Sequence, residues 1–305
     1  AKIGGALFSR IGLDSSLGEL LTGIVFGVSV LKLVSPEAIA PFGTIGSVLI
    51  LFIAGLKQQD IIEIYKDKIA IGMGILLLAV NSLVMTAIFY FVPRYFGINF
   101  TFIQSIVLAV AFAVIDIGVP AKVFISKGLI NHPVGRIAVR AAIVNIVLGL
   151  LLFTIVTLFL GSNLTEVAVK AGGIILFLLI TVGLVFFLSK ISKFVVRLHV
   201  EEAEFSLAVI LVLALAYITE IIGFSSVLGA FIAGVLLARM PFAETRSFSD
   251  KIKSLSFGLF VPLFFVWFGL TINLIEIWNN IALAALIFFS YTLLRFAVTY
   301  IFMKR

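Results

Sequence analysis

The stretch TFIQSIVLAVAFAVIDIGVPAKVF (101–124) decides the fold, together with GRIAVRAAIVNIVLGLLLF (135–153) after a short basic loop. Both runs are long enough to span a membrane, since about 20 helical residues cross the roughly 30 Å core of a bilayer. Asp116 lies near the middle of the first run, where a carboxylate costs roughly 3 kcal/mol unless something compensates it. Gly118 weakens the same turn and Pro120 removes a backbone donor, so we expect a discontinuous helix near Asp116–Pro120.

Composition extends this interpretation to the whole chain. Of the 305 residues, 62% are hydrophobic and 12% are charged, whereas soluble domains contain about 25% charged residues. We therefore expect an all-α, polytopic membrane protein, because a β-barrel would show short alternating segments. The apolar runs predict about ten full transmembrane helices, near residues 15–33, 40–57, 68–93, 101–127, 135–160, 168–188, 204–222, 225–240, 254–272 and 280–303.

Basic residues are distributed unevenly between the two sides of this arrangement. Sixteen Lys and Arg residues fall on one side, and only Lys32, Arg94 and Lys170 fall on the other. Basic loops remain in the cytoplasm, which places the richer side and the C-terminal end of the chain at the cytoplasmic face of the cell (plasma or inner) membrane. The net charge of +7 therefore reflects topology and does not indicate a nucleic-acid partner.

Enzymatic chemistry is not expected. No cysteine occurs, the two histidines lie in predicted loops, and no phosphate-binding, HExxH or nucleophile-elbow motif is present. We expect no cofactor and no metal site beyond a monovalent cation at Asp116.

An internal repeat is visible in the positions of the glycines. GLDSSLGELLTG (12–23) and GFSSVLGAFIAG (223–234) share glycines at a constant offset of 211 residues. Apolar runs that end in Gly-Leu follow each copy, as LFIAGL (51–56) and FFVWFGL (264–270). Repeats, commonly inverted, are how many transporters build alternating access.

The repeat predicts a division of the chain near residue 200. Residues 1–200 form a first repeat that includes the broken helix and the Asn145 helix. Residues 201–305 form a second, truncated repeat that includes the Arg295 helix. If the second copy is inverted, functional sites should lie between the two halves.

Three polar residues deep in predicted spans are the candidates for chemistry. Arg295 lies about nine residues, or about 13 Å, from its cytoplasmic helix end, too far for its side chain to reach the headgroups. Two roles are open for Arg295. One is to compensate charge, by pairing with Asp116 or by bonding Asn145 and free carbonyls. The other is that of a fixed charge that locks two helices together. Asp116 is either an ion- or proton-binding acid or a helix-packing acid. Asn145 either gives an oxygen to a cation or bonds a neighbouring helix.

The remaining charged residues near the spans have simpler interpretations. Glu19 lies about one turn inside its span and is expected to be a solvated charge at the rim. Lys122 and Arg140 are expected in a vestibule or at the headgroups.

Several segments resemble the monovalent cation:proton antiporters of the Kef and bacterial sodium/proton antiporter type. The similar segments are LGELLTGIVFG (17–27), LILFIAGLKQQD (49–60), residues 115–152, LGAFIAGVLLA (228–238) and FVPLFFVWFGLTI (260–272). The resemblance implies a homodimer whose protomers contain a scaffold domain and a core domain that moves like an elevator. It also implies that Arg295 stands where the family carries a core lysine or arginine. Asn145 takes the first place of the family's ion-binding pair.

Two departures from that family pattern affect the expected function. The second residue of the ion-binding pair, a carboxylate in the family, is Ile146, and Asp116 is the only nearby acid that could replace it. The family pattern also continues past the Arg295 helix with another broken helix and a final helix. Either the sequence is a piece of a longer protein, or those helices come from elsewhere, or this is a reduced relative.

The function predicted from these observations is a secondary transporter that exchanges Na⁺ or K⁺ for H⁺ by alternating access. Its partners would be the lipid bilayer, these ions and a second copy of the chain. Two alternatives remain at this point. One is a non-exchanging structural or regulatory subunit, derived from the antiporter fold, in a larger complex with additional membrane subunits. The other is a cation channel.

Overall fold

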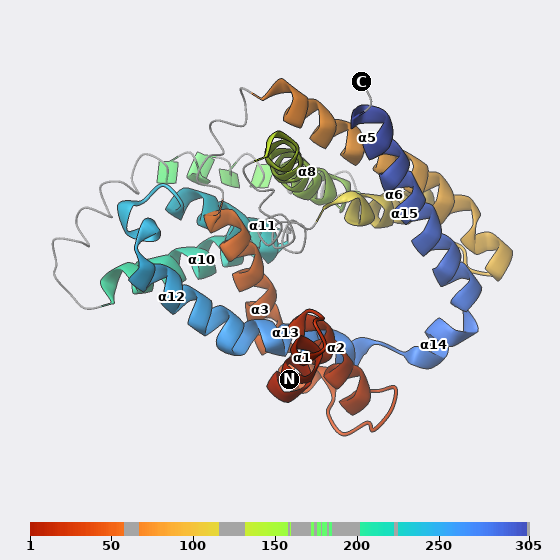
Figure 1. Cartoon of the computed structure of the whole chain (residues 1–305), viewed down its shortest axis with the longest axis horizontal. Helices are drawn as coiled ribbons and strands as arrows, with labels where there is room; N and C mark the ends of the chain where they lie inside the picture. The colour runs from red at the N-terminus through yellow and green to blue at the C-terminus, as the bar shows by residue number, and fades with distance from the viewer. Residues whose placement is uncertain are drawn as a thin grey trace. The chain divides into compact units, whose positions relative to one another are not determined.

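The computed structural model describes residues 1–57, 67–115, 132–157, 202–222 and 225–303, together with scattered positions between 159 and 184. Every regular element in these ranges is a helix, and none of the described residues forms a strand (Figure 1). The predicted all-α fold is confirmed.

Within the described residues, six helical segments are long and apolar enough to cross a membrane. They are α3 (Pro36–Leu56), α5 (Lys68–Phe91), α8 (Pro133–Thr157), α10 (Ala203–Ile221), the run from α12 (Arg246–Leu255) to α13 (Val261–Thr271), and α15 (Ile281–Met303). The π-helical turn η3 (Ser256–Phe260) makes α12 and α13 continuous. Three apolar helices are shorter, namely α2 (Ser15–Phe26), α6 (Phe102–Ala113) and α11 (Ser226–Leu237). The other described elements are α1 (Lys2–Arg10), η1 (Pro93–Phe96), η2 (Pro241–Glu244) and α14 (Leu274–Asn279).

The six long and three short apolar helices coincide with nine of the ten predicted spans, and residues 168–188 lie largely outside the described residues. Two of the nine are shorter than predicted. The helix expected at 15–33 ends at Phe26, because Gly27 turns to extended backbone and Lys32 takes a φ of +53°. The helix expected at 225–240 ends at Leu237. In the span expected at 101–127, α6 ends at Ala113, and residues 116–127 lie outside the described residues.

The helices divide into two compact units, and each unit combines segments that are distant in sequence. Unit 1 contains residues 1–59 and 173–279, and unit 2 contains residues 60–172 and 280–305. Each unit therefore draws on both sides of the repeat boundary predicted near residue 200.

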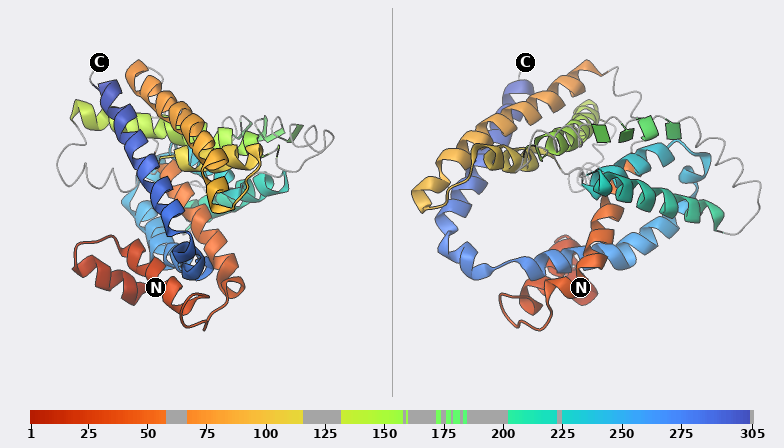
Figure 2. Two further views of the ribbon diagram at one scale, coloured as in Figure 1. Left: turned by 90° about the vertical axis from the view of Figure 1, so that its right-hand side faces the viewer. Right: turned by 180° about the vertical axis from the view of Figure 1, so that it is seen from behind.

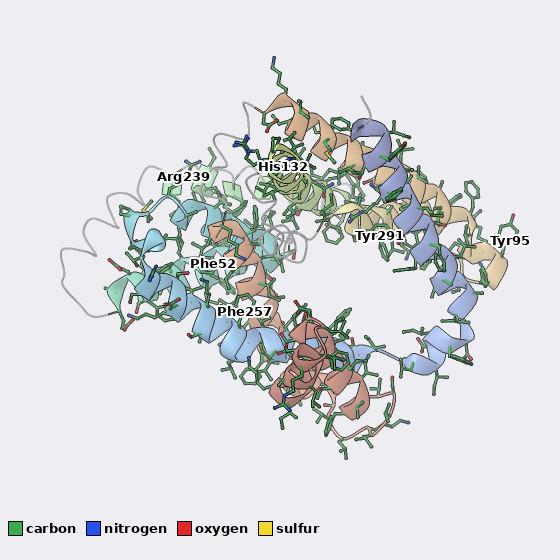
Figure 3. All side chains as sticks on the ribbon, in the orientation of Figure 1. Phe52, Tyr95, His132, Arg239, Phe257 and Tyr291 are labelled. Atoms are coloured by element: carbon green, nitrogen blue, oxygen red, sulfur yellow. The ribbon has the colours of Figure 1, made fainter. Side chains whose placement is uncertain are left out.

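Unit 1 is organised by glycines at two helix crossings. Gly55 of α3 and Gly234 of α11 face each other, and a Cβ added to Gly55 would lie 3.0 Å from the Cα of Gly234. Gly23 of α2 and Gly269 of α13 repeat this contact, with a Cβ on Gly23 lying 2.9 Å from the Cα of Gly269. Small residues let helix backbones approach closely in this way. Figure 3 labels Phe52, the 1% exposed side chain at the centre of this unit's core.

The two crossings are reciprocal in a way that supports the proposed repeat. Helices α2 and α11 contain the two copies of the glycine motif, and α3 and α13 contain the two runs that end in Gly-Leu. The first helix of each copy thus crosses the second helix of the other copy, α2 with α13 and α11 with α3. Two copies related by an approximate two-fold axis would give this exchange of partners.

Unit 2 is built from α5, α6, α8 and α15. Helix α5 contacts the other three, and Figure 2 shows α15, in dark blue, alongside α5, in orange. One buried cluster joins Leu77 of α5, Ala141 of α8 and Val298 of α15. A second joins Met85 of α5 to Ala109 of α6.

Candidate ion-binding site

Helix α6 stops part-way along the run that was predicted to span the membrane. It begins at a capping box between Thr101 and Gln104 and ends at Ala113, followed by Val114 in extended conformation. Twelve helical residues rise about 18 Å, well short of the roughly 30 Å hydrocarbon core. The last turn therefore leaves carbonyl groups without helical partners in an apolar region.

Arg295 of α15 binds these carbonyls. Its Nη2 donates at 3.2 Å to Phe112 O, at 3.2 Å to Ala113 O and at 3.0 Å to Val114 O. A cation is favourable at a helix C-terminus, where the helix dipole concentrates partial negative charge. The guanidinium carbon also lies 4.4 Å from the ring centroid of Tyr291, one turn earlier on α15 and labelled in Figure 3.

Asn145 of α8 binds the next free backbone group. The residue is completely buried, and its Oδ1 accepts a hydrogen bond from the N–H of Ile115 at 2.8 Å. Its Nδ2 is buried and has no hydrogen-bond partner within the described residues. Ile146, the next residue, is 5% exposed and lies in the interior of the protein.

The described chain stops at Ile115, one residue before the predicted acid. Asp116, Gly118, Pro120 and Lys122 lie outside the described residues. The interruption of α6 begins at Val114, ahead of both the glycine and the proline from which it was predicted. Arg295 and Asn145 thus bind the two residues that precede Asp116. The two side chains come from opposite sides of the repeat boundary predicted near residue 200.

Glu19 differs from its predicted environment. The expectation of a solvated rim charge is wrong, because Glu19 is 4% exposed. It packs beneath α1, where a Cβ added to Gly5 would lie 3.2 Å from its Oε1. Glycines on α1 let this helix approach α2 closely enough to cover the carboxyl group of Glu19. Nothing in the sequence of the short α1 segment indicated this packing.

Arg140 lies near the start of α8 and forms a defined ion pair. Its Nη1 lies 3.1 Å from Oδ2 of Asp67, the residue that caps the start of α5. In the part of the chain that the structure describes, no group of three or more His, Cys, Asp or Glu residues could hold a metal ion.

Sequence reasoning did not single out Asn81, a buried polar residue that is a candidate for function. It lies in the middle of α5 with 0% exposure, and the sequence signal was a lone amide inside a 24-residue apolar helix.

Together these features define a class of protein: a multi-pass helical membrane protein with a helix that stops inside the apolar region, its free backbone groups bound by an arginine and an asparagine. The family model for the transmembrane sodium/hydrogen exchanger matches residues 1–305. The chain belongs to the sodium/hydrogen exchanger family, which is a family of transporters, and the resemblance found in the sequence is confirmed.

Individual relatives agree with this assignment. The chain is 30% identical over 285 residues to the probable Na(+)/H(+) antiporter GerT of Bacillus cereus, covering 89% of this chain and 71% of that protein. It is 26% identical over 302 residues to the Na(+)/H(+)-K(+) antiporter GerN of Bacillus cereus, covering 92% and 71%. It is 29% identical over 271 residues to the glutathione-regulated potassium-efflux system protein KefC of Klebsiella pneumoniae (strain 342), covering 87% and 42%.

A solved structure shows the same fold. The sodium proton antiporter MjNhaP1 from Methanocaldococcus jannaschii superposes with a TM-score of 0.66 at 19% sequence identity, over 99% of this chain and 75% of that one.

Proposed function

We propose that this chain exchanges Na⁺ or K⁺ for H⁺ across the cell membrane by alternating access. The observation that carries the proposal is the end of α6, where Arg295 binds three carbonyls and Asn145 binds the N–H of Ile115. Discontinuous helices whose free backbone groups surround an ion are characteristic of secondary transporters. The names of GerT and GerN, both antiporters, favour the same activity.

In this proposal each residue near the break has a distinct role. Asp116 takes up the proton and the cation in turn, because Ile146 provides no carboxylate at the neighbouring position. Asn145 holds the backbone just before Asp116, and its side-chain amide forms part of the site. Arg295 compensates negative charge at the end of α6.

The two compact units suggest how the site could gain access to each side. Unit 2 contains the broken helix, Asn145 and Arg295, and would be the moving core. Unit 1, with its close glycine crossings, would be the scaffold and the surface for a homodimer. The exchange requires no cofactor besides the cation and the proton. The chain would lie in the plasma or inner membrane with its C-terminal end cytoplasmic.

Ion-driven pH change in proteoliposomes tests this function. Wild-type protein should alkalinise the lumen when Na⁺ or K⁺ is added outside, because the inward cation is exchanged for an outward proton, and Asp116→Asn should abolish the response. Glu37→Gln is the matched control, because Glu37 is an exposed acid in the first turn of α3. Full exchange by the Asp116→Asn variant would remove Asp116 from the mechanism, and no exchange by wild-type protein would refute the function.

The alternatives of a non-exchanging subunit and a cation channel gain no support from the comparisons. Ile146 was the residue that favoured the first of them. The same liposome experiment separates all three activities, since a subunit would give no flux and a channel would pass cations without counter-transported protons.

A further inference from the structure

Asn81 of α5 has a buried amide that the proposed mechanism does not use. It is 0% exposed, and its Nδ2 donates to Leu77 O at 2.6 Å within the same helix. Its Oδ1 is buried and has no hydrogen-bond partner in the part of the chain that the structure describes. A buried acceptor left unpaired costs about 1–3 kcal/mol, and membrane interiors offer no water to relieve it.

The register between α5 and α6 places Asn81 at the level of the helix break. The two helices are consecutive and antiparallel, with the ring of Tyr90 5.7 Å from that of Phe102 and Met85 in one buried cluster with Ala109. One helical turn further along each helix, in opposite directions, lie Asn81 and Ala113. Both are completely buried.

The other neighbours of Asn81 along α5 support the same placement. Leu77, one turn earlier, belongs to a buried cluster against which Ile115 packs, the residue whose N–H is bound by Asn145. Leu294, next to Arg295, packs against this cluster and also against the cluster of Met85. Asn81 is therefore flanked on both sides by residues that pack around the end of α6.

Two further polar atoms around the break are unpaired. Among the described residues, Nδ2 of Asn145 and Nε of Arg295 are buried donors without hydrogen-bond partners, and Oδ1 of Asn81 is a buried acceptor without one. A bound species that satisfies all three atoms must accept hydrogen bonds from the two N–H groups and must also interact with the amide oxygen of Asn81. Water does both, and a monovalent cation with a partial hydration shell does so as well.

We propose that Asn81 is a further ligand of the exchange site, whose Oδ1 binds the transported monovalent cation or a water in its first hydration shell. This inference rests on the proposed exchange function and adds a fourth helix, α5, to the site. An amide oxygen in this position would help to discriminate between Na⁺ and K⁺, because the two ions differ in the distance at which oxygen ligands bind.

The variant Asn81→Leu separates a ligand from a purely structural amide. Leucine has a similar volume and removes the unpaired Oδ1, while Leu77 O keeps its helical hydrogen bond. Replacing a half-satisfied buried amide by an apolar group should leave stability unchanged or raise it. Binding of the cation should nevertheless weaken.

The experiment measures exchange in proteoliposomes and thermal unfolding of the purified protein in Na⁺, K⁺ or choline chloride. We expect Asn81→Leu to raise the KM for the cation by about tenfold or more with kcat changed less than about threefold, which is the pattern for lost ground-state binding. Its unfolding temperature in choline should equal or exceed that of wild type. The additional stabilisation that Na⁺ or K⁺ gives wild-type protein should be lost.

Asn81→Asp and Thr219→Val complete the design. Aspartate keeps the oxygen ligand and adds charge, so it should retain a KM near that of wild type and shift the pH profile of exchange. Thr219 is a completely buried polar residue of α10 in unit 1, whose hydroxyl is already bonded to Leu215 O and Ala216 O. Its replacement should leave the KM and the cation-dependent stabilisation unchanged.

The outcomes distinguish this inference from the function on which it rests. Exchange by wild type with an unchanged KM in Asn81→Leu would overturn the role of Asn81 and leave the exchange function intact. Absence of exchange would refute the function, and the thermal measurement would still decide the role of Asn81. Cation-dependent stabilisation present in wild type and lost in Asn81→Leu supports the ligand, whereas equal stabilisation in both proteins, or none in either, refutes it.

Discussion

Arg295 and Val114 are 181 residues apart in sequence, yet Nη2 of the arginine donates to the valine carbonyl at 3.0 Å and so closes the C-terminus of α6. The same nitrogen also donates to the carbonyls of Phe112 and Ala113. A helix end inside a membrane needs partners of this kind, because hydrocarbon supplies none. The position of the break therefore depends on α15 as much as on the sequence of α6.

Replacing Arg295 should destabilise this helix end. Hydrogen bonds to a charged group contribute about 1.5–3 kcal/mol, so Arg295→Gln should lower the unfolding temperature by about 5 °C or more and reduce exchange strongly. Arg295→Lys keeps the charge but replaces the planar guanidinium by a compact ammonium, and it should fall between Gln and wild type. Equal unfolding temperatures for wild type and the Gln variant would show that the three contacts contribute nothing to stability.

Asn145 and Asn81 should respond in opposite ways to the same substitution. Asn145→Leu removes the acceptor for the N–H of Ile115 and leaves that donor buried, at a cost of about 1–3 kcal/mol. Asn145→Asp keeps the acceptor and should preserve the bond. Thermal unfolding of the purified variants measures the difference, with Asn81→Leu as the variant that should not be destabilised. Equal stability of the Leu and Asp variants at position 145 would contradict the role assigned to Oδ1.

Much of this architecture was predictable from the sequence. The apolar runs predicted the spans, and the distance of Arg295 from its helix end predicted an interior arginine that pairs with Asp116 or bonds Asn145 and free carbonyls. The end of α6 was not predictable from local signals. Gly118 and Pro120, which lie outside the described residues, predicted a break near them; α6 ends at Ala113, and side chains from α8 and α15 bind the backbone groups of Ile115 and Val114 that follow.

Two other features depended on tertiary structure in the same way. Glu19 is buried because glycines on α1 allow that helix to lie against α2, and no pattern within α2 reveals the cover. Asn81 was not predicted as a site residue because a single asparagine in an apolar helix is a weak sequence signal for function. Its significance came from an unpaired oxygen at the level of the break, which only the packing of α5 against α6 discloses.

The reciprocal glycine crossings predict matched effects in the two copies of the repeat. A Cβ on Gly55 would lie 3.0 Å from the Cα of Gly234, so Gly55→Val should push α3 and α11 apart at a cost of about 1–3 kcal/mol. Gly269→Val should cost a similar amount at the crossing of α2 and α13. Unfolding of the purified variants provides the comparison.

Gly72 is the control for these glycine variants. It is an exposed glycine of α5 with no atom within 4 Å of an added Cβ. Gly72→Ala should be neutral or stabilise the helix by about 0.5–1 kcal/mol. A loss at Gly72 equal to the loss at Gly55 would mean that backbone freedom, and not close helix approach, explains the glycines.

Asp67 predicts how the stability of unit 2 depends on acid pH. Its carboxylate accepts from the N–H of Ala70 at 3.0 Å and pairs with Arg140 at 3.1 Å, and these contacts lower the pKa of Asp67 below its ordinary value of 3.8. A lowered folded-state pKa stabilises the protein above the unfolded-state value, and this stabilisation is lost as the pH falls through the folded-state pKa. Thermal unfolding below pH 4 should therefore show a decline for wild type that is smaller in Asp67→Asn. At neutral pH the Asn variant should lose about 1 kcal/mol or less, because asparagine still caps α5 but no longer pairs with Arg140. An identical acid decline in both proteins would assign the pH dependence to other carboxylates.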